Sequence, residues 1–424
     1  MKGWKMVDVS QIVEENEASI QTGPFGTQLK ASDYQSEGFP VINVRNIGLG
    51  QELNATLEHI GDHMAVKLKQ HKLQFGDIVF SRKGAVERHL LITKKQNGYY
   101  QGSDCIRLRI TSKDINKKFL SYFFLTEGHK QWMEAQGSFG ATMGSLNQGI
   151  IKRIKFPLPP LPIQKKIAGV LSGYDELIEN NNRRIAILEK MAEEIYREWF
   201  VRVRFPGHEN TKIVKGVPEG WAVKRVKDIG TVVTGKTPST AEPKYYTGKY
   251  SFIKTPDMHG NLFILQTEET LSEDGFRSQP TQILPEGSIC VSCIGTGGIV
   301  TITTEKSQTN QQINSVISNK DYYLPWAFFT LCSLKETIKM FGSTGTTMTN
   351  LSKNKFANLK IFFPLNELLK QFHDVTIPLL EKHKTLLKAN QNLKKTRDAL
   401  LPRLISGKLD VENLDITLPP GMHS

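Results

Sequence analysis

The chain of 424 residues contains the same arrangement twice. A Gly-Trp pair stands at residues 3–4 and again at residues 220–221, and the glycine-rich stretch 137–143 recurs as 342–348. Solenoid units are only about 20–50 residues long, so a repeat of half the chain indicates duplicated domains instead. Such a molecule has pseudo-twofold symmetry and two similar surfaces, which suits a target made of two parts.

Each half combines mixed α/β patterning with a long stretch of helical periodicity. In the first half, residues 106–110 alternate apolar and basic side chains, which predicts a strand with one face in water. The predicted fold class is α+β, with two similar mixed α/β domains and two long helices. The predicted segments are a first domain at 1–160, a first helix at 161–206, a second domain at 207–366, a second helix at 367–407 and a tail at 408–424.

The two long stretches carry heptad repeats. Residues at seven-residue spacing are apolar over most of both stretches, which predicts a coiled coil. The core residues expected from this pattern are Ile167, Tyr174, Leu188, Ile195 and Trp199 in the first helix, and Phe372, Leu379, Leu386, Leu393 and Leu400 in the second.

Two apolar stripes of this length are best buried against each other, and pseudo-twofold symmetry makes that pair antiparallel. Asn181 interrupts one apolar row and is a candidate for fixing the register. Pro378 lies within the second heptad pattern and predicts a kink or a late start of that helix. The alternative arrangement is that each helix packs only on its own domain.

The charge of the chain favours a polyanionic partner. The net charge is +13, and residues 1–160 contribute 21 Lys and Arg against 15 Asp and Glu, whereas residues 161–206 are nearly neutral with 8 against 7. The excess of positive charge therefore lies mainly in the duplicated domains, which is typical of nucleic-acid binding. A basic protein without such a partner is the alternative.

The cysteine and histidine patterns predict no metal site. Cys290 and Cys293 form a single C-x-x-C without the second pair that zinc requires, and we interpret them as reduced structural thiols. His59, His63 and His71 are interpreted as surface residues. The first residues lack the apolar core of a signal peptide, and no apolar run approaches the roughly 20 residues of a membrane span. We expect a cytoplasmic protein with no membrane contact.

Sequence marks of catalysis are absent. The chain has neither an Asn/Asp-Pro-Pro-Tyr/Phe tetrad, as known amino-methyltransferases carry, nor a G-x-x-x-x-G-K-[ST] phosphate loop. We therefore predict no catalytic residues and no enzyme activity of the chain by itself.

These features together resemble the specificity subunits of type I restriction-modification systems. The resemblance covers nearly the whole chain. It is carried by the two Gly-Trp pairs, by the stretches 156–164, 195–201 and 342–352, and by residues 400–409, which are similar to the usual C-terminal ending of that family. One departure is residues 366–369, where a second proline-rich helix entry would be usual.

The resemblance implies a DNA-binding adaptor. Each repeated domain would be a target recognition domain that reads one half of a split, asymmetric DNA sequence, and the helix pair would fix the unread spacer. The helices would also dock two methylation subunits, which methylate adenine at N6, and restriction subunits would join these. S-adenosylmethionine, ATP and Mg²⁺ would belong to those partners, and this chain would bind no cofactor.

Comparing the two halves suggests residues that touch DNA. Positions that are alike should build the fold or hold phosphates, because phosphate contacts position a protein whereas base contacts specify the sequence. Hydroxyls of the glycine-rich stretches are the candidates for phosphate contact: Ser138, Thr142, Ser343 and Thr347. The alternative is that these stretches are only turns that pack near the helix entry.

Positions that differ between the halves are candidates for reading bases. Residues 43–46 correspond to residues 254–257, and residues 81–84 correspond to residues 292–295. Arginine and asparagine side chains can make paired contacts with guanine and adenine, respectively. The candidates are Asn43, Arg45, Asn46, Arg82 and Lys83 in the first domain, and Lys254, Thr255 and Ser292 in the second. The alternative for the arginines is contact with solvent or phosphate.

Three alternatives to the type I subunit remain open from the sequence. The specificity subunit of a type IIB enzyme differs only in its partners. A stand-alone DNA methyltransferase or nuclease would bind its own cofactor, and a coiled-coil scaffold would not bind DNA at all.

Overall fold

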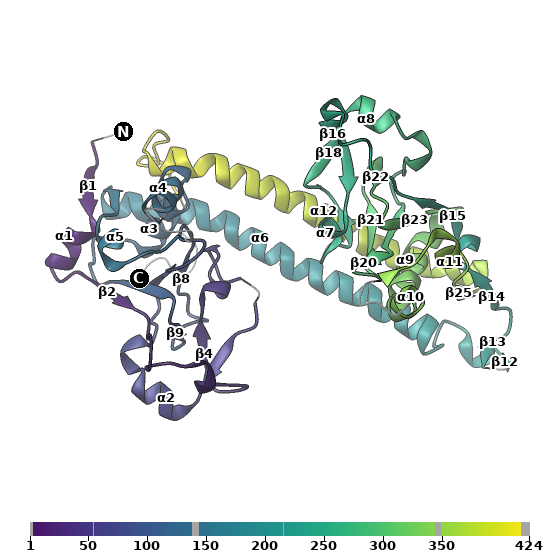
Figure 1. The fold of residues 1–424 in the computed structure, drawn as a ribbon, viewed down its shortest axis with the longest axis horizontal. Coiled ribbons are helices and arrows are strands. Elements are labelled where there is room, and N and C mark those ends of the chain that lie inside the picture. Colours follow the sequence, from purple (N-terminus) through teal and green to yellow (C-terminus); the bar gives the residue numbers. More distant parts are fainter. Residues whose placement is uncertain (1–2, 54, 138–143, 215, 344–348, 417–424) are drawn as a thin grey trace. The chain divides into compact units, whose positions relative to one another are not determined.

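The computed structural model describes residues 3–53, 55–137, 144–214, 216–343 and 349–416. The chain forms two compact units (Figure 1). The first unit contains Met1–Ile178 and Asn392–Ser424, and the second contains Glu179–Gln391. Each unit therefore joins one repeated domain to a part of each long helix.

The first unit holds three sheets. A two-stranded sheet pairs β1 with β11, a five-stranded sheet has the order β2-β10-β7-β8-β5, and a four-stranded sheet has the order β3-β6-β4-β9. Its strands are β1 (Lys5–Asp8), β2 (Ala18–Thr22), β3 (Tyr34–Gln35), β4 (Phe39–Ile42), β5 (Leu49–Gly50), β6 (Glu58–Ile60), β7 (Ile78–Ser81), β8 (His89–Leu91), β9 (Tyr100–Gln101), β10 (Cys105–Ile110) and β11 (Lys155–Leu158). Its shorter helices are α1 (Val9–Glu14), α2 (Asp62–Lys67), α3 (Lys117–Phe124), α4 (Glu127–Gly137) and α5 (Gln148–Lys152).

The second unit repeats this order. The pair β14-β25 matches β1-β11, the order β15-β23-β19-β21-β17 matches the five-stranded sheet, and β18-β16-β22 matches three strands of the four-stranded sheet. The strands are β14 (Ala222–Arg225), β15 (Gly230–Thr234), β16 (Tyr246–Ile253), β17 (Phe263–Ile264), β18 (Glu269–Leu271), β19 (Ile289–Ser292), β21 (Val300–Thr303), β22 (Ser307–Thr309), β23 (Ile313–Ser318) and β25 (Lys360–Phe363). Two further small pairs are β12 (Ile213–Val214) with β13 (Val217–Pro218), and β20 (Ile294–Gly295) with β24 (Thr349–Asn350). The helices are α7 (Thr255–Met258), α8 (Glu273–Arg277), α9 (Leu324–Ser333), α10 (Lys335–Gly342) and α11 (Lys353–Ala357).

Strand directions also agree between the units. Most pairs are antiparallel, but β5 pairs with β8 in parallel, as does β17 with β21. The pair β4-β9 is parallel in the first unit, and its counterpart β16-β22 is parallel in the second. The predicted α+β fold with two similar mixed domains is therefore confirmed.

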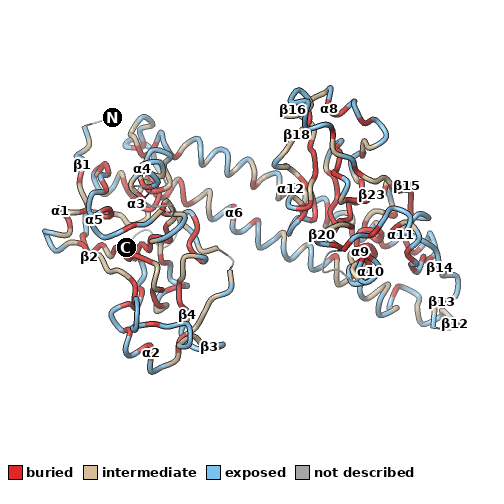
Figure 2. The backbone as a smooth tube through the Cα atoms, in the orientation of Figure 1, coloured by how far each residue is buried: buried red, intermediate tan, exposed pale blue. Residues whose placement is uncertain are grey.

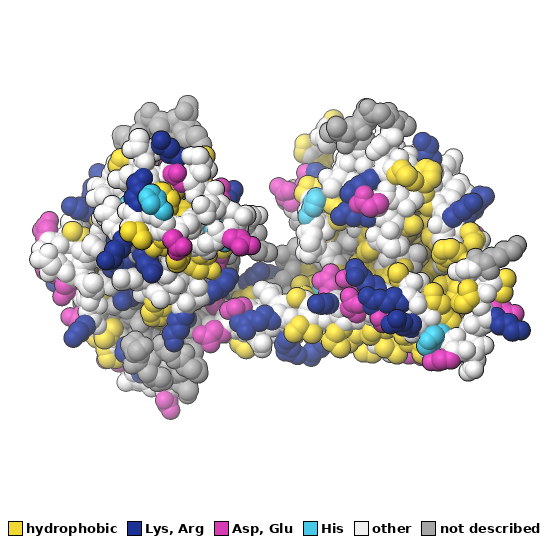
Figure 3. All heavy atoms as spheres, turned by 90° about the horizontal axis from the view of Figure 1, so that it is seen from below, with side chains coloured by type: hydrophobic (Ala, Val, Ile, Leu, Met, Phe, Trp, Pro, Cys, Tyr) yellow, Lys and Arg dark blue, Asp and Glu magenta, His cyan; other side chains and the backbone are white. Residues whose placement is uncertain are grey.

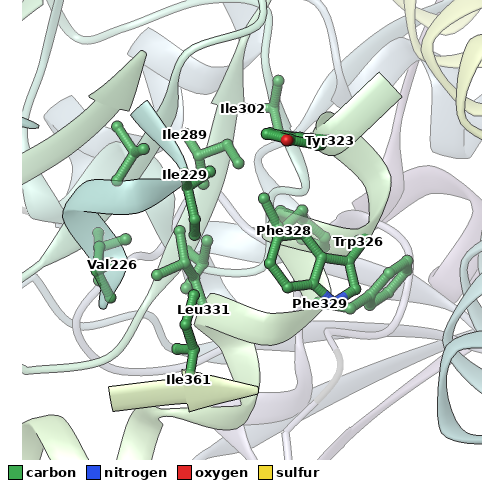
Figure 4. Close-up of a cluster of buried hydrophobic side chains, with 14 of the residues drawn as sticks. Val226, Ile229, Ile289, Ile302, Tyr323, Trp326, Phe328, Phe329, Leu331 and Ile361 are labelled. Carbon is green, nitrogen blue, oxygen red and sulfur yellow. The ribbon is translucent and has the colours of Figure 1, made fainter. Parts of the chain in front are cut away.

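A sheet-and-helix core fills each unit. In the second unit, α9 packs on the five-stranded sheet, and its almost fully buried Trp326 belongs to one core cluster with the strand residues Ile289 and Ile302 (Figure 4). In the first unit, Leu120 and Phe124 of α3 occupy the corresponding place. Figure 2 shows the buried residues concentrated on the inner strands and helix faces of each unit.

The expected wet face of β10 is covered instead. Arg107 is buried, and its Nη1 donates to the backbone oxygen of Gln70 at 3.0 Å. Arg109 lies beside it and donates from Nε and Nη2 to the two carboxylate oxygens of Asp77, both at 2.7 Å. The segment before β7 therefore lies over these arginines, and their charges are used inside the fold.

The long helices are α6 (Leu161–Tyr196), which ends in a π-helical turn at Arg197–Val201, and α12 (Asn366–Ile405). Pro378 predicted a kink or a late start of the second helix; the late start is wrong, because α12 begins at Asn366 and continues through Pro378. Pro378 and Asp374 are both exposed. The helical bond that proline cannot donate would have gone to the Asp374 carbonyl, which water can reach, so the loss is tolerated.

Both units place α6 against α12, and each helix also packs on the domain of that unit. In the first unit, Ile167 and Leu171 of α6 share a core with Leu401 and Leu404 of α12. In the second unit, Tyr196 near the end of α6 meets Phe372 near the start of α12. The early part of one helix thus pairs with the late part of the other, so the helices run antiparallel, as predicted.

The predicted apolar rows are wholly or partly buried. Ile167, Phe372 and Leu386 are buried. The remaining predicted core residues are half-buried: Tyr174, Leu188, Ile195, Trp199, Leu379, Leu393 and Leu400.

A row of polar residues lies beside them on α12 at heptad spacing. Asn390 accepts a hydrogen bond at Oδ1 from Asn181 Nδ2 at 2.9 Å, and its own Nδ2 donates to Asn182 Oδ1 at 2.8 Å. In the first unit, Arg397 donates to Asp175 at 2.6 Å. Asn181 and Asn390 are both buried, so shifting the helices would leave their amides without partners. The expected register role of Asn181 is supported by this contact.

The two repeated tryptophans pack on the chain that leaves a long helix. Trp221 lies 5.9 Å from Phe200 and 5.8 Å from Phe205, measured between ring centroids. Trp4 lies against Gly407, which has a φ of +68°, and a Cβ on that glycine would come within 3.0 Å of the indole ring. Each Gly-Trp pair therefore marks where a domain closes against the end of a helix.

The predicted surface position of one histidine is wrong. His71 is buried with 1% exposure, whereas His59 is half-buried and His63 is exposed. Two histidines that the sequence did not single out, His89 and His129, are also buried, among the aromatic rings of α3 and α4. His89 Nε2 lies 2.8 Å from Ser121 Oγ.

We predict that removing one amide of the buried pair destabilises the second unit. In Asn390→Ala, the Asn181 amide stays buried without its partner, which should cost about 1–3 kcal/mol of the free energy of unfolding, measured in urea. The exposed Asn392→Ala on the same helix is the matched control and should change little. The double variant Asn181→Leu/Asn390→Leu should recover the loss. Equal effects of Asn390→Ala and Asn392→Ala would contradict this role.

We also predict that the first unit loses stability in mild acid. Burial lowers the pKa of His89 to about 3 and that of His129 to about 4, so both are neutral when folded and take up protons on unfolding below about pH 6.5. Each proton taken up on unfolding lowers the free energy of unfolding by about 1.4 kcal/mol per pH unit as the pH falls toward 4.

The pH dependence can be measured by urea unfolding between pH 7 and 4. His89 occupies the register position that Val300 fills in the second unit. The variant His89→Val should therefore reduce the acid sensitivity of the first unit. An unchanged pH dependence in His89→Val would contradict the assignment.

Candidate nucleic-acid interface

Two segments that carry candidate DNA contacts meet in the first unit at the β9–β10 loop (residues 102–104). Gly102 N–H donates to the Ile42 oxygen at 2.9 Å, directly before the segment 43–46. Arg82 N–H donates to the Asp104 oxygen at 2.8 Å. Backbone bonds therefore bring the residues after β4 and after β7 to one place.

The second unit builds the same junction at the β22–β23 loop (residues 310–312). Asn310 N–H donates to the Ile253 oxygen at 3.2 Å, and Cys293 N–H donates to the Gln312 oxygen at 2.8 Å. Strand register makes Ser81 equivalent to Ser292, since they pair with Cys105 and Ile313. Positions in the two junctions can therefore be compared one by one.

A glycine lies in close contact with the backbone of each loop. A Cβ on Gly23 would come within 1.9 Å of the Gly102 oxygen, and one on Gly235 would come within 2.2 Å of the Asn310 oxygen. No side chain fits at either position without moving the backbone, so both copies need glycine there. The residues after each glycine enter the junction as a further segment.

Arg82 and Lys83 lie on the accessible side of the first junction. The Arg82 guanidinium is half-buried and stands 6.0 Å above the ring of Phe25, which is exposed. Lys83 Nζ lies 3.0 Å from Asp104 Oδ1, and both side chains are largely exposed. Because an exposed ion pair contributes little free energy, Lys83 can exchange this partner for a phosphate.

Asn43 and Arg45 share one carboxylate at the same junction. Asn43 Nδ2 donates to Glu58 Oε2 at 2.6 Å, and Arg45 Nη2 lies 3.0 Å from Glu58 Oε1. Asn43 Nδ2 also approaches the Tyr34 hydroxyl at 3.4 Å, and burial raises the pKa of that hydroxyl. The Arg45 side chain remains half exposed and is more accessible to a ligand than the Asn43 side chain.

Base contact by Asn46 is not supported. Its side chain is fully buried, its Oδ1 accepts from Asn43 N–H at 3.0 Å, and its Nδ2 donates to the Ala55 oxygen at 3.2 Å. Both ends of the amide thus hold the turn after β4. The sequence pattern could not distinguish a turn-forming asparagine from an exposed one.

The second junction keeps the carboxylate but changes its partner. Glu269 pairs with Phe252 in the sheet as Glu58 pairs with Val41, and the Lys254 ammonium donates to Glu269. Thr255 is buried and its hydroxyl donates to Gln312 Oε1 at 3.3 Å. A lysine thus stands where the first unit has Asn43.

Ser292 is structural. It is fully buried, its hydroxyl donates to the Thr296 oxygen at 2.6 Å and accepts from Ile299 N–H at 2.8 Å. The expected DNA contact by Ser292 is therefore not supported. Its counterpart Ser81 is also buried and donates to the Lys83 oxygen at 2.9 Å.

The candidates for phosphate contact are only partly placed. Ser343 is exposed at the end of α10, where its hydroxyl donates to the Lys339 oxygen at 2.8 Å. Ser138, Thr142 and Thr347 lie outside the described residues. The flanking residues do reach the junctions, because Ser145 forms a β-bridge with Lys83 and β24 pairs with β20.

Sequence comparison missed the two loops that form the centre of the junctions. Ser103 and Asp104 occupy the positions of Gln311 and Gln312. Gln101 and Thr309 hold equivalent register positions, and each stands four positions before the first residue of the next strand. The two glutamines directly precede the strand at 313–318. Extending the alignment of this strand with β10 by two residues toward the N-terminus would have identified them.

Cys105, Cys290 and Cys293 are buried, whereas Cys332 is half-buried. Burial raises the pKa of Cys290 to about 12 and that of Cys293 to about 11, and the two side chains belong to different core clusters. Within the described residues, no group of three or more His, Cys, Asp and Glu side chains has metal-binding geometry. No helix in the described part is long and apolar enough to span a membrane.

Comparisons with known proteins agree with the duplicated architecture. The family model described as "Type I restriction modification DNA specificity domain" matches residues 1–190 and 218–392. The specificity subunit of the type I restriction enzyme HindI from Haemophilus influenzae is 27% identical, over 79% of this chain and 86% of the relative. The MjaIX specificity subunit from Methanocaldococcus jannaschii is 30% identical, over 72% of both chains.

A solved type I restriction-modification S subunit from M. genitalium has a similar fold. Its TM-score is 0.61 at 16% identity, with 95% of this chain and 96% of that chain covered. The family model covers both halves of the chain, and the two junctions fall inside the matched ranges. The chain therefore belongs to the family of type I restriction-modification specificity subunits.

Proposed function

We propose that each recognition domain reads one half of a bipartite, asymmetric DNA target through its junction loop. The observation that carries this proposal is the contrast between backbone and side chains. The same backbone bonds hold residues 102–104 and 310–312, but the side chains presented there differ. Two domains that share a backbone framework but expose different side chains suit two half-sites of different sequence.

The helix pair is proposed to set the length of the unread spacer. The buried contact between Asn181 and Asn390 in the second unit favours one register, and the partly exposed pair of Asp175 and Arg397 in the first unit agrees with it. A fixed register keeps the helix pair at a constant length, and this supports a spacer of constant length.

An exposed stripe of α6 is proposed to dock two methylation subunits. In the second unit, Ile187 and Met191 of α6 and Val201 of the π-helical turn that follows are each about half exposed or more. Figure 3 shows hydrophobic side chains beside clustered charged ones on a face of the second unit. Apolar positions rimmed by charge are typical of interaction surfaces.

The chemistry of the assembly is assigned to partner subunits. The methylation subunits would flip an adenine out of the duplex and methylate it at N6 with S-adenosylmethionine. Restriction subunits, with ATP and Mg²⁺, would join for cleavage. The chain itself would act as the adaptor in the cytoplasm, and a type IIB partner set would use the same adaptor.

We predict that Arg82→Ala changes one half-site only. Loss of the guanidinium beside Phe25 should reduce discrimination in that half-site by about 1–3 kcal/mol, because arginine makes paired contacts with guanine. Binding to duplexes with single base changes in either half-site measures this. Arg153→Ala, an exposed arginine of the same unit, is the matched control and should leave both half-sites unchanged. Equal losses at both half-sites in Arg82→Ala would count against the assignment.

The purified chain without partners should bind DNA but transfer no methyl group. Its affinity for duplex DNA should fall steeply between 50 and 200 mM salt, roughly as expected for release of several counterions. Calorimetry should detect no binding of S-adenosylmethionine. Methyl transfer by the isolated chain would favour a stand-alone enzyme, and DNA binding that is absent at every salt concentration would favour a scaffold.

A further inference from the structure

Gln311 in the second junction has an exposed side chain in a defined orientation. The Thr237 hydroxyl donates to Gln311 Oε1 at 2.6 Å. Thr237 is half-buried and follows Gly235, the glycine in close contact with the backbone of the loop. The close backbone approach at this glycine therefore places the hydroxyl that holds the amide.

The remaining hydrogen-bonding groups of Gln311 are open to a ligand. Oε1 keeps a second lone pair, and Nε2 has no hydrogen-bond partner among the described residues. The side chain thus presents one acceptor and one donor side by side. Because its torsions are already restrained, less side-chain entropy is lost when a ligand binds.

This arrangement matches adenine. In the major groove, adenine offers an N7 acceptor and an N6 donor, and a glutamine amide can bind both at once. Guanine offers two acceptors, N7 and O6, and is matched instead by arginine or lysine. A neutral amide with one donor and one acceptor therefore favours adenine over guanine.

The first junction has the opposite character at equivalent positions. Arg82 corresponds to Cys293, which is 1% exposed, and Lys83 corresponds to Ile294. The second junction thus lacks the two cations that suit guanine at these positions. Ser103 stands where the second unit has Gln311, so the amide belongs to the second unit alone.

We propose that Gln311, oriented by Thr237, determines the specificity of the second recognition domain by reading an adenine in its half-site. This inference rests on the proposed function, since it requires that the second junction faces DNA bases. It assigns the residue and the base class that the duplication by itself leaves open.

The test uses the full chain in complex with its methylation partner. Gln311→Ala should lower the preference for one A·T pair of a single half-site by roughly 5- to 150-fold in competitive duplex binding. Thr237→Val removes only the orienting hydroxyl and should lower the same preference by a smaller factor. Gln282→Ala is the matched control, because Thr281 Oγ1 likewise donates to Gln282 Oε1 at 3.0 Å outside the junction. That control should leave the target unchanged.

A second measurement needs no variant. Replacing each adenine of the target in turn by 7-deazaadenine removes the N7 acceptor, and one such position should weaken binding by the wild-type complex. At that position, Gln311→Ala should show no further loss.

The outcomes separate the two proposals. If the wild-type complex recognises a two-part target and Gln311→Ala keeps every base preference, the inference on Gln311 is overturned. If the wild-type complex recognises no two-part target, the proposed function itself fails.

Discussion

The antiparallel pairing of α6 and α12 is the constraint on which the rest of the structure depends. Two heptad stripes cannot remain in water, and burying them against each other brings parts of both helices into each unit. Each domain then completes its core with residues that lie far apart in the chain. Trp4 packing on Gly407 shows this most directly, because a residue near the start of the first domain lies against the chain just after the end of the last helix.

The two junctions share a backbone framework but present different side chains. Gly23 and Gly235 remain glycine because the neighbouring backbone leaves no space for a Cβ. Glu58 and Glu269 also persist, although their partners differ between the units. Side chains that face away from these fixed contacts are free to change, and this is where recognition can diverge without cost to the fold.

Sequence patterns predicted the features that depend on period and repetition. Heptads predicted that the two long helices pair, and the matching halves predicted that the pair is antiparallel and that the two domains share one topology. The burial and contacts of individual side chains were harder to predict from the sequence. Asn46 and Ser292 were expected at an interface but are buried, and their side chains hold the turns that follow strands, because the same residue types serve turns and ligands. His383 and Asn390 escaped notice because a search for apolar rows passes over buried polar ones. The contact that orients Gln311 could not be predicted because its partner, Thr237, lies 74 residues away.

The central claim is that one chain carries two different readers at a fixed spacing. The most direct measurement is a map of methylated adenines, by long-read sequencing, in a host that carries this chain and its methylation partner. The account predicts one asymmetric motif with two specified parts and an unread spacer of constant length. A continuous or palindromic motif, or a spacer of variable length, would contradict it.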